Sequence, residues 1–533
     1  MGSELSIFGL KLSATRLALL ACLLIPAVYT AVALVSPPSM DPDVGWGLMA
    51  WRSMLQGAPF NHYLTPDPAN IGRDTTAFLA WWSPGQYLAP GAFSLTGLNY
   101  GQAIALTNGL ALTIFLIGIV RLCRRFDLDP LVTLAAVLLL ATFRYSTATF
   151  GIYNGGEILL QAALPWVVLL SLRVPAANLL TGAGLAFLIV GLGFMAKLTG
   201  IVVGAAALTA SCLPVLLDRR RITPGMIGGV IGAGIAVVLL YVLWFSNGDT
   251  PGTIAVGAKP GGVALAVISP WTAGFSFVDL LLWLFIHPGR AVFSNVSTLV
   301  LMSAPVAALI AFCVLMGRKR ETLRPLIVYA LIFYAFTSLI MAVMFLRGAD
   351  VTVEERHVRS AGILLFLCSL AGVMNLPRLP RTAFLGLFAV MSAYGLASMG
   401  LRTKSVLHAD HLIARSGVND MFVDRAAVEF IQGAYVREGK SALFVVPMAD
   451  IALALPNEAR VVSISATGAA HLEAARYDGA VPGHLYIMIQ KRFVDTPKGR
   501  SIPASFAAYA PDRWEFQDFG DTRVYFQQAG ARP

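Results

Sequence analysis

The strongest constraint on the fold is a series of eleven long apolar segments within residues 1–400. About 20 apolar residues in a helix are needed to cross the hydrocarbon core of a bilayer, and each segment is close to that length. Only 13% of the residues are charged, whereas a soluble domain has about a quarter. We therefore predict an α-helical polytopic membrane protein with transmembrane helices at 15–35, 101–120, 130–147, 158–173, 178–197, 199–217, 225–246, 296–316, 325–346, 360–376 and 382–400.

The basic residues are concentrated in the short turns between these segments. The formal net charge is +10, but Lys and Arg placed between apolar spans indicate membrane orientation and not a nucleic-acid-binding face. Because basic turns stay in the cytoplasm, we predict a cytoplasmic N-terminus, and an odd number of spans puts the C-terminus outside. The basic turns are at 121–125, 219–221, 318–324 and 378–381.

The cysteines give no sign of a disulfide framework or of a metal centre. All five lie within the predicted spans or at their cytoplasmic ends, and no Cys/His spacing typical of zinc is found. They are Cys22, Cys123, Cys212, Cys313 and Cys368.

The first outer loop, at 36–100, is long, aromatic and rich in proline. Asp41 and Asp43 follow the first span directly, at the predicted membrane boundary. We expect Asp43 to cap a helix at 44–56, which Gly57 would end. That segment is apolar apart from Arg52, so we expect an interfacial helix lying on the membrane. A carboxylate at the start of such a helix is a candidate general base, although a helix cap alone would also explain it.

A second outer loop, at 247–295, begins with glycine and proline and continues with an apolar piece at 275–286. That piece is too short to span, so we expect an interfacial or re-entrant helix.

The composition changes near residue 401, where charges become frequent. We divide the chain into a membrane domain at 1–400 and an extracytoplasmic α/β domain at 401–533. No glycine-rich nucleotide-binding loop is found there, so a structural cap or an acceptor-docking domain is expected. Strands are predicted at 442–446, 460–464 and 485–489, a helix at 424–436, and a hairpin at 514–519 and 522–527.

Several charged residues fall at the predicted outer ends of spans, where ionisable groups are costly and usually functional or paired. Glu157 opens the fourth span, where the helix dipole alone would favour a carboxylate. Lys197 lies between the fifth and sixth spans and suits a lipid phosphate, unless its side chain simply reaches water. Arg356 and Arg359 are spaced to share a helix face as a phosphate clamp, unless they pair with the neighbouring glutamates. His357 lies between them and is a weaker candidate.

These motifs together resemble the GT-C superfamily of integral-membrane glycosyltransferases, which includes the protein O-mannosyltransferases and the aminoarabinose transferases. The resemblance covers nearly the whole chain. It is carried by the acidic MDPD at 40–43, GAPF at 57–60, WSPG at 82–85 with Trp82, Lys197, the arginine-bearing loop before the tenth span, and the C-terminal outer domain.

The resemblance implies transfer of a sugar from a polyprenyl-phosphate carrier to a lipid, glycan or protein acceptor, with inversion. It places the enzyme in the bacterial inner (plasma) membrane, with its active site outside. The acidic residue after the first span acts as base, and the spacing to Gly57 favours Asp43 over Asp41. Substrate-binding candidates are Lys197, Arg356, Arg359, His357, Arg52, Asp74, Glu157 and Trp82.

No cofactor is expected to be required. Some GT-C members bind a divalent metal, and Asp41, Asp74 and Glu157 could supply oxygen ligands to Mg²⁺ or Mn²⁺.

Two other functions share some of these features. A polymerase or ligase of lipid-linked glycans would use the same kind of lipid substrate. A transporter or flippase would be expected to show internal repeats with paired broken helices, and no convincing repeat is found.

The predicted orientation is testable with a reporter fused after Pro533. A reporter that works only after export should be active, because the C-terminal domain is expected outside the cytoplasm. Activity of a cytoplasm-specific reporter at that position would contradict the orientation.

Overall fold

The computed structural model describes residues 4–7, 10–248, 257–276, 296–349, 351, 354–408, 416–419, 423–463 and 476–530. Their contacts form two compact units. The first comprises residues 1–31, 108–149 and 156–401, and the second comprises 32–107, 150–155 and 402–533.

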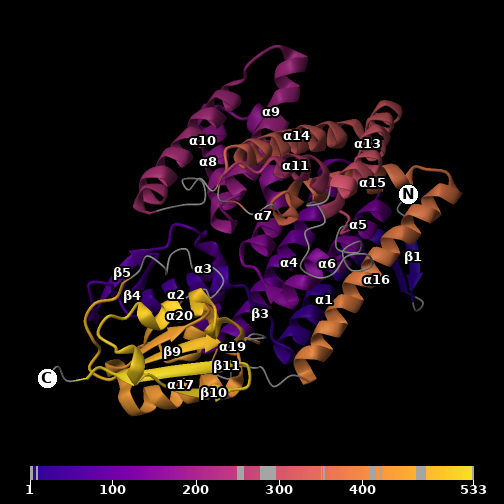
Figure 1. Ribbon diagram of the computed structural model, residues 1–533. Coiled ribbons are helices and arrows are strands. Elements are labelled where there is room, and N and C mark those ends of the chain that lie inside the picture. The colour runs from indigo at the N-terminus through magenta and orange to yellow at the C-terminus, as the bar shows by residue number, and fades with distance from the viewer. Residues whose placement is uncertain are drawn as a thin grey trace. The chain divides into compact units, whose positions relative to one another are not determined.

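The first unit is built from helices, and every predicted span corresponds to one or two of them (Figure 1). Among the described residues, eight helices are long and apolar enough to cross a membrane, or nine if the bent pair α5 and α6 is one span. The count of eleven therefore stays a prediction. The helices are α1 Ala14–Val35, α4 Tyr100–Arg125, α5 Pro130–Thr142, α6 Arg144–Thr147, α7 Gly156–Ser171, α8 Leu179–Ala196, α9 Gly200–Arg219, α10 Pro224–Leu243, α11 Pro260–Ala273, α13 Val296–Lys319, α14 Arg324–Leu346, α15 Arg359–Met374 and α16 Arg378–His408.

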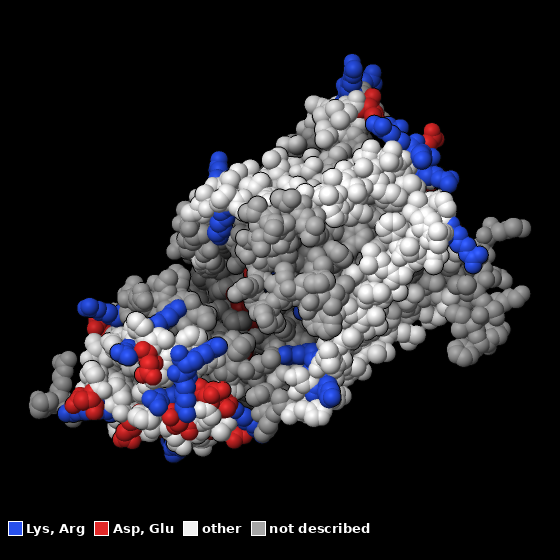
Figure 2. Space-filling model, turned by 45° about the vertical axis from the view of Figure 1, so that its right-hand side comes forward, with Lys and Arg blue, Asp and Glu red and all other residues white. Residues whose placement is uncertain are grey.

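The surface of these helices is apolar where lipid is expected. Figure 2 shows a broad uncharged area of the surface, with Lys and Arg gathered at its margins. On α10, Val230 is 76% exposed and Val238 is 60% exposed. Such exposure would be unfavourable in water and is ordinary in a bilayer.

Glycines allow α8 and α10 to pack with their backbones in contact. A Cβ at Gly228 would lie 2.0 Å from the carbonyl oxygen of Leu179, and one at Gly232 would lie 2.0 Å from that of Ala183. Small residues at such positions are the usual means of close helix packing in membranes, where no hydrophobic effect drives helices together.

The helix α11 was not predicted. The sequence before it is rich in glycine and proline, and Pro260 occupies the first turn of α11, where proline is tolerated. Most of its residues are buried in the first unit. The expected interfacial helix at 275–286 lies outside the described residues, apart from Phe275 and Ser276.

The third predicted span is broken. The helices α5 and α6 meet at 53°, and Phe143 between them is extended. The break packs against α16, because a Cβ at Gly395 would lie 2.1 Å from the carbonyl oxygen of Thr142. The hydroxyl of Thr147 also donates to the Gly395 carbonyl at 3.0 Å. The bend is therefore held from outside the helix pair.

The second unit contains a five-stranded sheet with strand order β10-β11-β9-β7-β8. The strand β7 (Leu443–Val446) is parallel to β8 (Arg460–Ser463) and β9 (His484–Gln490), while β10 (Glu515–Phe519) and β11 (Thr522–Gln528) form an antiparallel hairpin next to β9. These strands correspond to the predicted ones, and α17 (Arg425–Glu438) to the predicted helix.

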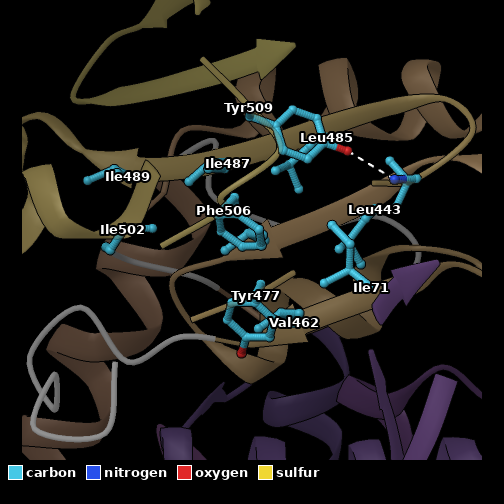
Figure 3. Packing of buried hydrophobic residues seen from close by; sticks show 12 residues of the cluster. Ile71, Leu443, Val462, Tyr477, Leu485, Ile487, Ile489, Ile502, Phe506 and Tyr509 are labelled. Atoms are coloured by element: carbon cyan, nitrogen blue, oxygen red, sulfur yellow. Dashed lines mark hydrogen bonds between the residues drawn. The ribbon is translucent and has the colours of Figure 1, made fainter. Parts of the chain in front are cut away.

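Both faces of this sheet are covered. Phe444 and Tyr486 stack on one face, where Tyr435 and Phe430 of α17 contact them. The opposite face carries a buried cluster that includes Leu443, Leu485 and Phe506 (Figure 3). The strand β7 is buried on both faces, as is usual for a central parallel strand.

The first outer loop belongs to the same unit as the sheet. A hairpin of β4 (His62–Asp67) and β5 (Asn70–Phe78) places Ile71 in the buried cluster of Figure 3. The Ile71 N–H donates to the Asp478 carbonyl at 2.9 Å, and the Asp478 N–H donates to the Pro68 carbonyl at 2.8 Å. The loop and the C-terminal segment therefore share one hydrophobic core.

The helix α2 (Pro42–Leu55) differs from the expected interfacial helix in two ways. Its Val44 and Leu48 are fully buried, and the helix packs against α3 (Gly85–Ser94), β4 and α18 (Ala449–Ala454). Its cap is Asp41, whose carboxylate accepts from the Asp43 N–H at 3.1 Å. The expectation that Asp43 caps the helix was wrong, because Pro42 starts the helix and leaves Asp43 in the first turn.

Arg52 joins α2 to the chain between α18 and β8. It is 4% exposed, and its guanidinium donates to four backbone carbonyls at 2.6–3.0 Å, those of Ala452, Pro456, Asn457 and Ala459. Arg52 thus stabilises the second unit, and its position explains a charge on an otherwise apolar helix.

We expect Arg52→Met to destabilise the second unit by about 3 kcal/mol or more, because it removes four hydrogen bonds from a charged donor to backbone carbonyls. Thermal unfolding of the purified protein in detergent measures this. Arg73→Met is the matched control, since Arg73 is exposed and should change stability by about 0.5 kcal/mol or less. Equal effects of the two substitutions would contradict the role given to Arg52.

Candidate functional site

A buried group of charged residues lies in the first unit, where the ends of several helices meet. Glu157 is in the first turn of α7 and has a side chain 5% exposed. Its carboxylate forms an ion pair with the ammonium of Lys197, whose side chain is 12% exposed. The guanidinium of Arg356 lies 3.4 Å from the same carboxylate oxygen. Three residues that the sequence marked separately therefore meet at one place.

Lys197 lies in the turn between α8 and α9, and this turn positions its side chain next to Glu157. Lys197 is extended and follows the last residue of α8, and its carbonyl accepts from the Gly200 N–H at 2.8 Å. A Cβ at Gly193 would lie 2.3 Å from the carbonyl oxygen of Gly200. Because both residues are glycine, the two helices approach closely enough to make the turn tight.

Arg356 and Arg359 come from the segment that begins α15. Arg356 lies in a short 3-10 helix, and its Nε is 2.5 Å from a carboxylate oxygen of Glu354. Pairing with a neighbouring glutamate, the alternative to a phosphate clamp, is thus observed for Arg356. Glu354 has a side chain 49% exposed, however, so water weakens this pair relative to the buried pair with Glu157.

Among the described residues of this group, positive charge exceeds negative charge. Lys197, Arg356 and Arg359 all act electrostatically on Glu157, and Glu157 supplies the carboxylate that faces them from inside the unit. A buried excess of cations favours binding of an anion, because charges attract more strongly where water is excluded.

His357 is buried beside these cations. Burial, together with the positive charges of Lys197, Arg356 and Arg359, holds the pKa of His357 well below its usual value near 6.5. The imidazole is therefore neutral at physiological pH, and it can donate or accept a hydrogen bond without adding charge.

The sequence analysis missed Tyr145, which contacts this group. The guanidinium carbon of Arg359 lies 5.3 Å from the centre of the Tyr145 ring, a cation–π contact. Tyr145 is on α6, just after the break at Phe143. An aromatic residue inside an apolar span is ordinary, so nothing in the sequence signals this role.

The second unit holds the remaining candidates. Asp41 and Asp43 are both half-buried at the start of α2, and the Asp41 N–H donates to the Tyr153 carbonyl at 3.0 Å. Asp74 forms an ion pair with Arg460 at 2.8 Å, which links β5 to β8. Trp82 is half-buried and lies against Trp81.

Metal ligands are not grouped in the described part of the chain. Within it, no three His, Cys, Asp or Glu side chains lie together in a way that could hold a metal ion. Asp74, one of the expected oxygen ligands, is engaged by Arg460.

Comparison with known proteins identifies the fold of this chain through solved structures and not through sequence. No protein-family model matches the chain, and no curated protein matches it by sequence. Among solved structures, ArnT from Cupriavidus metallidurans in the apo state matches with a TM-score of 0.54 at 14% identity, covering 94% of this chain and 97% of that chain. The chain has the GT-C fold.

Two further solved structures match this chain. ArnT from Cupriavidus metallidurans bound to undecaprenyl phosphate gives a TM-score of 0.50 at 13% identity, with the same coverage of both chains. Arabinofuranosyltransferase AftD from Mycobacteria gives 0.44 at 12% identity, covering 98% of this chain and 42% of that chain. At such identities the likeness concerns the fold.

The pairing of Glu157 can be tested by its loss. We expect Glu157→Gln to destabilise the first unit by about 3–5 kcal/mol, because it leaves Lys197 buried without its counter-charge. Unfolding in detergent, followed by heat or denaturant, measures the change. Glu354→Gln is the matched control and should cost about 1 kcal/mol or less, since that partner of Arg356 is half exposed. A Glu157→Gln protein as stable as the control variant would show that the pair contributes little.

Proposed function

We propose that the protein is a membrane glycosyltransferase that takes a sugar from a polyprenyl-phosphate carrier and transfers it, with inversion, to an acceptor on the outer face of the membrane. The observation that carries the proposal is the excess of half-buried cations around the buried carboxylate of Glu157 in a chain of GT-C fold. A structure of similar fold, that of ArnT, holds undecaprenyl phosphate, which supports a lipid phosphate as the anion.

The cations suit the leaving group of this reaction. The acceptor oxygen attacks the anomeric carbon of the sugar, and the bond from that carbon to the carrier phosphate breaks. The electron pair stays on the phosphate, whose charge rises from −1 to −2. Lys197, Arg356 and Arg359 would stabilise this added charge, and preorganised cations in a water-poor site are effective in this role.

Glu157 would set the strength of this anion site. By neutralising one cation, it keeps Lys197 and Arg356 in place when no donor is bound. A buried cluster of unpaired cations would otherwise be costly. We therefore assign Glu157 a positioning role and do not use it as a base.

Asp43 would accept the proton that the acceptor hydroxyl loses. The resemblance to GT-C enzymes and the spacing of fourteen residues to Gly57 favour it. The presence of an aspartate at position 41 is already explained by the hydrogen bond with which it caps α2. After transfer, the proton on Asp43 would pass to water and restore the carboxylate.

The proposal predicts that Asp43→Asn folds normally and loses transfer activity by about 10²–10⁴-fold, the usual contribution of a positioned base. The assay is sugar transfer from a synthetic polyprenyl-phosphate donor to an extract of native acceptors, with the full chain in nanodiscs. Asp41→Asn should cost less, because asparagine caps helices nearly as well as aspartate.

The control for this experiment is Asp129→Asn. Asp129 caps α5, with Pro130 following it, in the same way that Asp41 caps α2. Its substitution should leave transfer unchanged. Near-full activity of Asp43→Asn in a protein that turns over the donor would remove Asp43 as the base and direct the search to Asp41.

A further inference from the structure

We propose that Tyr145 is a donor-binding residue whose ring fixes the Arg359 guanidinium and whose buried hydroxyl donates a hydrogen bond to a phosphate oxygen of the carrier lipid. The inference rests on the proposed function, since it adds a contact to the same anion site. It concerns a residue that neither the sequence motifs nor the fold comparison marks.

The ring of Tyr145 is held rigidly. Tyr145 is 3% exposed, and its ring packs edge-on against Phe143 with the ring centres 5.9 Å apart. Phe143 packs in turn against Phe366 of α15 at 5.1 Å. Arg359 begins the same helix, so the aromatic group and the guanidinium that it contacts are supported by one element.

Two donor atoms at this contact lack partners. Among the described residues, neither the Tyr145 hydroxyl nor the Arg359 Nε has a hydrogen bond, although both atoms are buried. The guanidinium carbon of Arg359 lies 5.3 Å from the centre of the Tyr145 ring, which places the two groups close together. Most buried polar atoms in proteins are paired, so two unpaired donors side by side point to a ligand with several acceptor oxygens.

The two hydroxyl residues that follow Tyr145 on α6 are both paired, in contrast to the Tyr145 hydroxyl. The Ser146 hydroxyl donates to the Leu140 carbonyl at 2.7 Å and accepts from Gln161 at 2.8 Å. The Thr147 hydroxyl donates to the Gly395 carbonyl. The segment after the break between α5 and α6 thus pairs the hydroxyls of Ser146 and Thr147 and leaves that of Tyr145 available.

A phosphate group fits these donors. It offers several anionic oxygens, and Lys197 and Arg356 lie in the same charged group as Arg359. The Tyr145 hydroxyl would add an uncharged donor, which strengthens phosphate binding by a directed hydrogen bond and leaves the net charge of the site unchanged.

The test compares Tyr145→Phe with the wild-type full chain in nanodiscs, using undecaprenyl phosphate as the probe. Binding is measured by native mass spectrometry and by the rise in unfolding temperature on adding the lipid. We expect Tyr145→Phe to bind the lipid about tenfold more weakly, while the lipid-free protein keeps or gains stability, because an unpaired buried hydroxyl is removed. Tyr145→Leu should bind more weakly still, since the support for Arg359 is lost as well.

Tyr329→Phe is the matched control. The Tyr329 hydroxyl lies 3.0 Å from that of Ser171 in the same unit, so its loss should lower stability and leave lipid affinity unchanged. If Tyr145→Phe bound the lipid as tightly as the wild type, the inference about Tyr145 would be overturned and the proposed function would stand. If Tyr145→Phe lost as much stability as Tyr329→Phe, the inference would also be overturned, because the Tyr145 hydroxyl would then have a structural partner. Absence of lipid binding by the wild type would overturn the proposed function together with it.

Discussion

The arrangement of the first unit depends on one buried carboxylate. Glu157 lies at the start of α7, and its charge is acceptable there only because Lys197 and Arg356 pair with it. This requirement brings together the end of α8 and the segment that opens α15, which are far apart in the sequence. The same pairing leaves an excess of positive charge, with Arg359 on the ring of Tyr145. A structural need and the proposed anion site are thus met by the same residues.

The second unit depends on a different kind of contact, in which the first outer loop and the C-terminal segment complete each other. Ile71 contributes to the core beneath β7 and β9, and Asp74 pairs with Arg460. Arg52 donates to backbone carbonyls of the C-terminal segment in α18 and just after it. Asp41 and Asp43 are therefore carried by a helix that is anchored in a folded domain, and their positions depend on that domain. The C-terminal segment is accordingly part of the support for the proposed base.

Particular residues show how far sequence reasoning reached. Lys197 and Glu157 were marked because charges at span ends are costly, and the structure pairs them. Arg52 and Asp74 were candidates as charged residues of the first outer loop, yet backbone carbonyls and Arg460 engage them. A sequence shows that a buried charge needs a partner, but it does not show whether that partner is a ligand or the protein itself. Tyr145 was missed because its role depends on an unpaired hydroxyl, which no sequence pattern records.

The sequence by itself determined the long apolar helices and the strands of the C-terminal sheet. These follow from local properties, namely the length of apolar runs, the alternation of side chains and the spacing of turns. The tertiary structure alone decided that the first outer loop folds with the C-terminal segment, that Asp41 and not Asp43 caps α2, and that Glu157 collects two cations. Each of these rests on contacts between distant residues or on the geometry of one proline, and the free energy of burying and pairing polar groups selects among them only once the chain is folded.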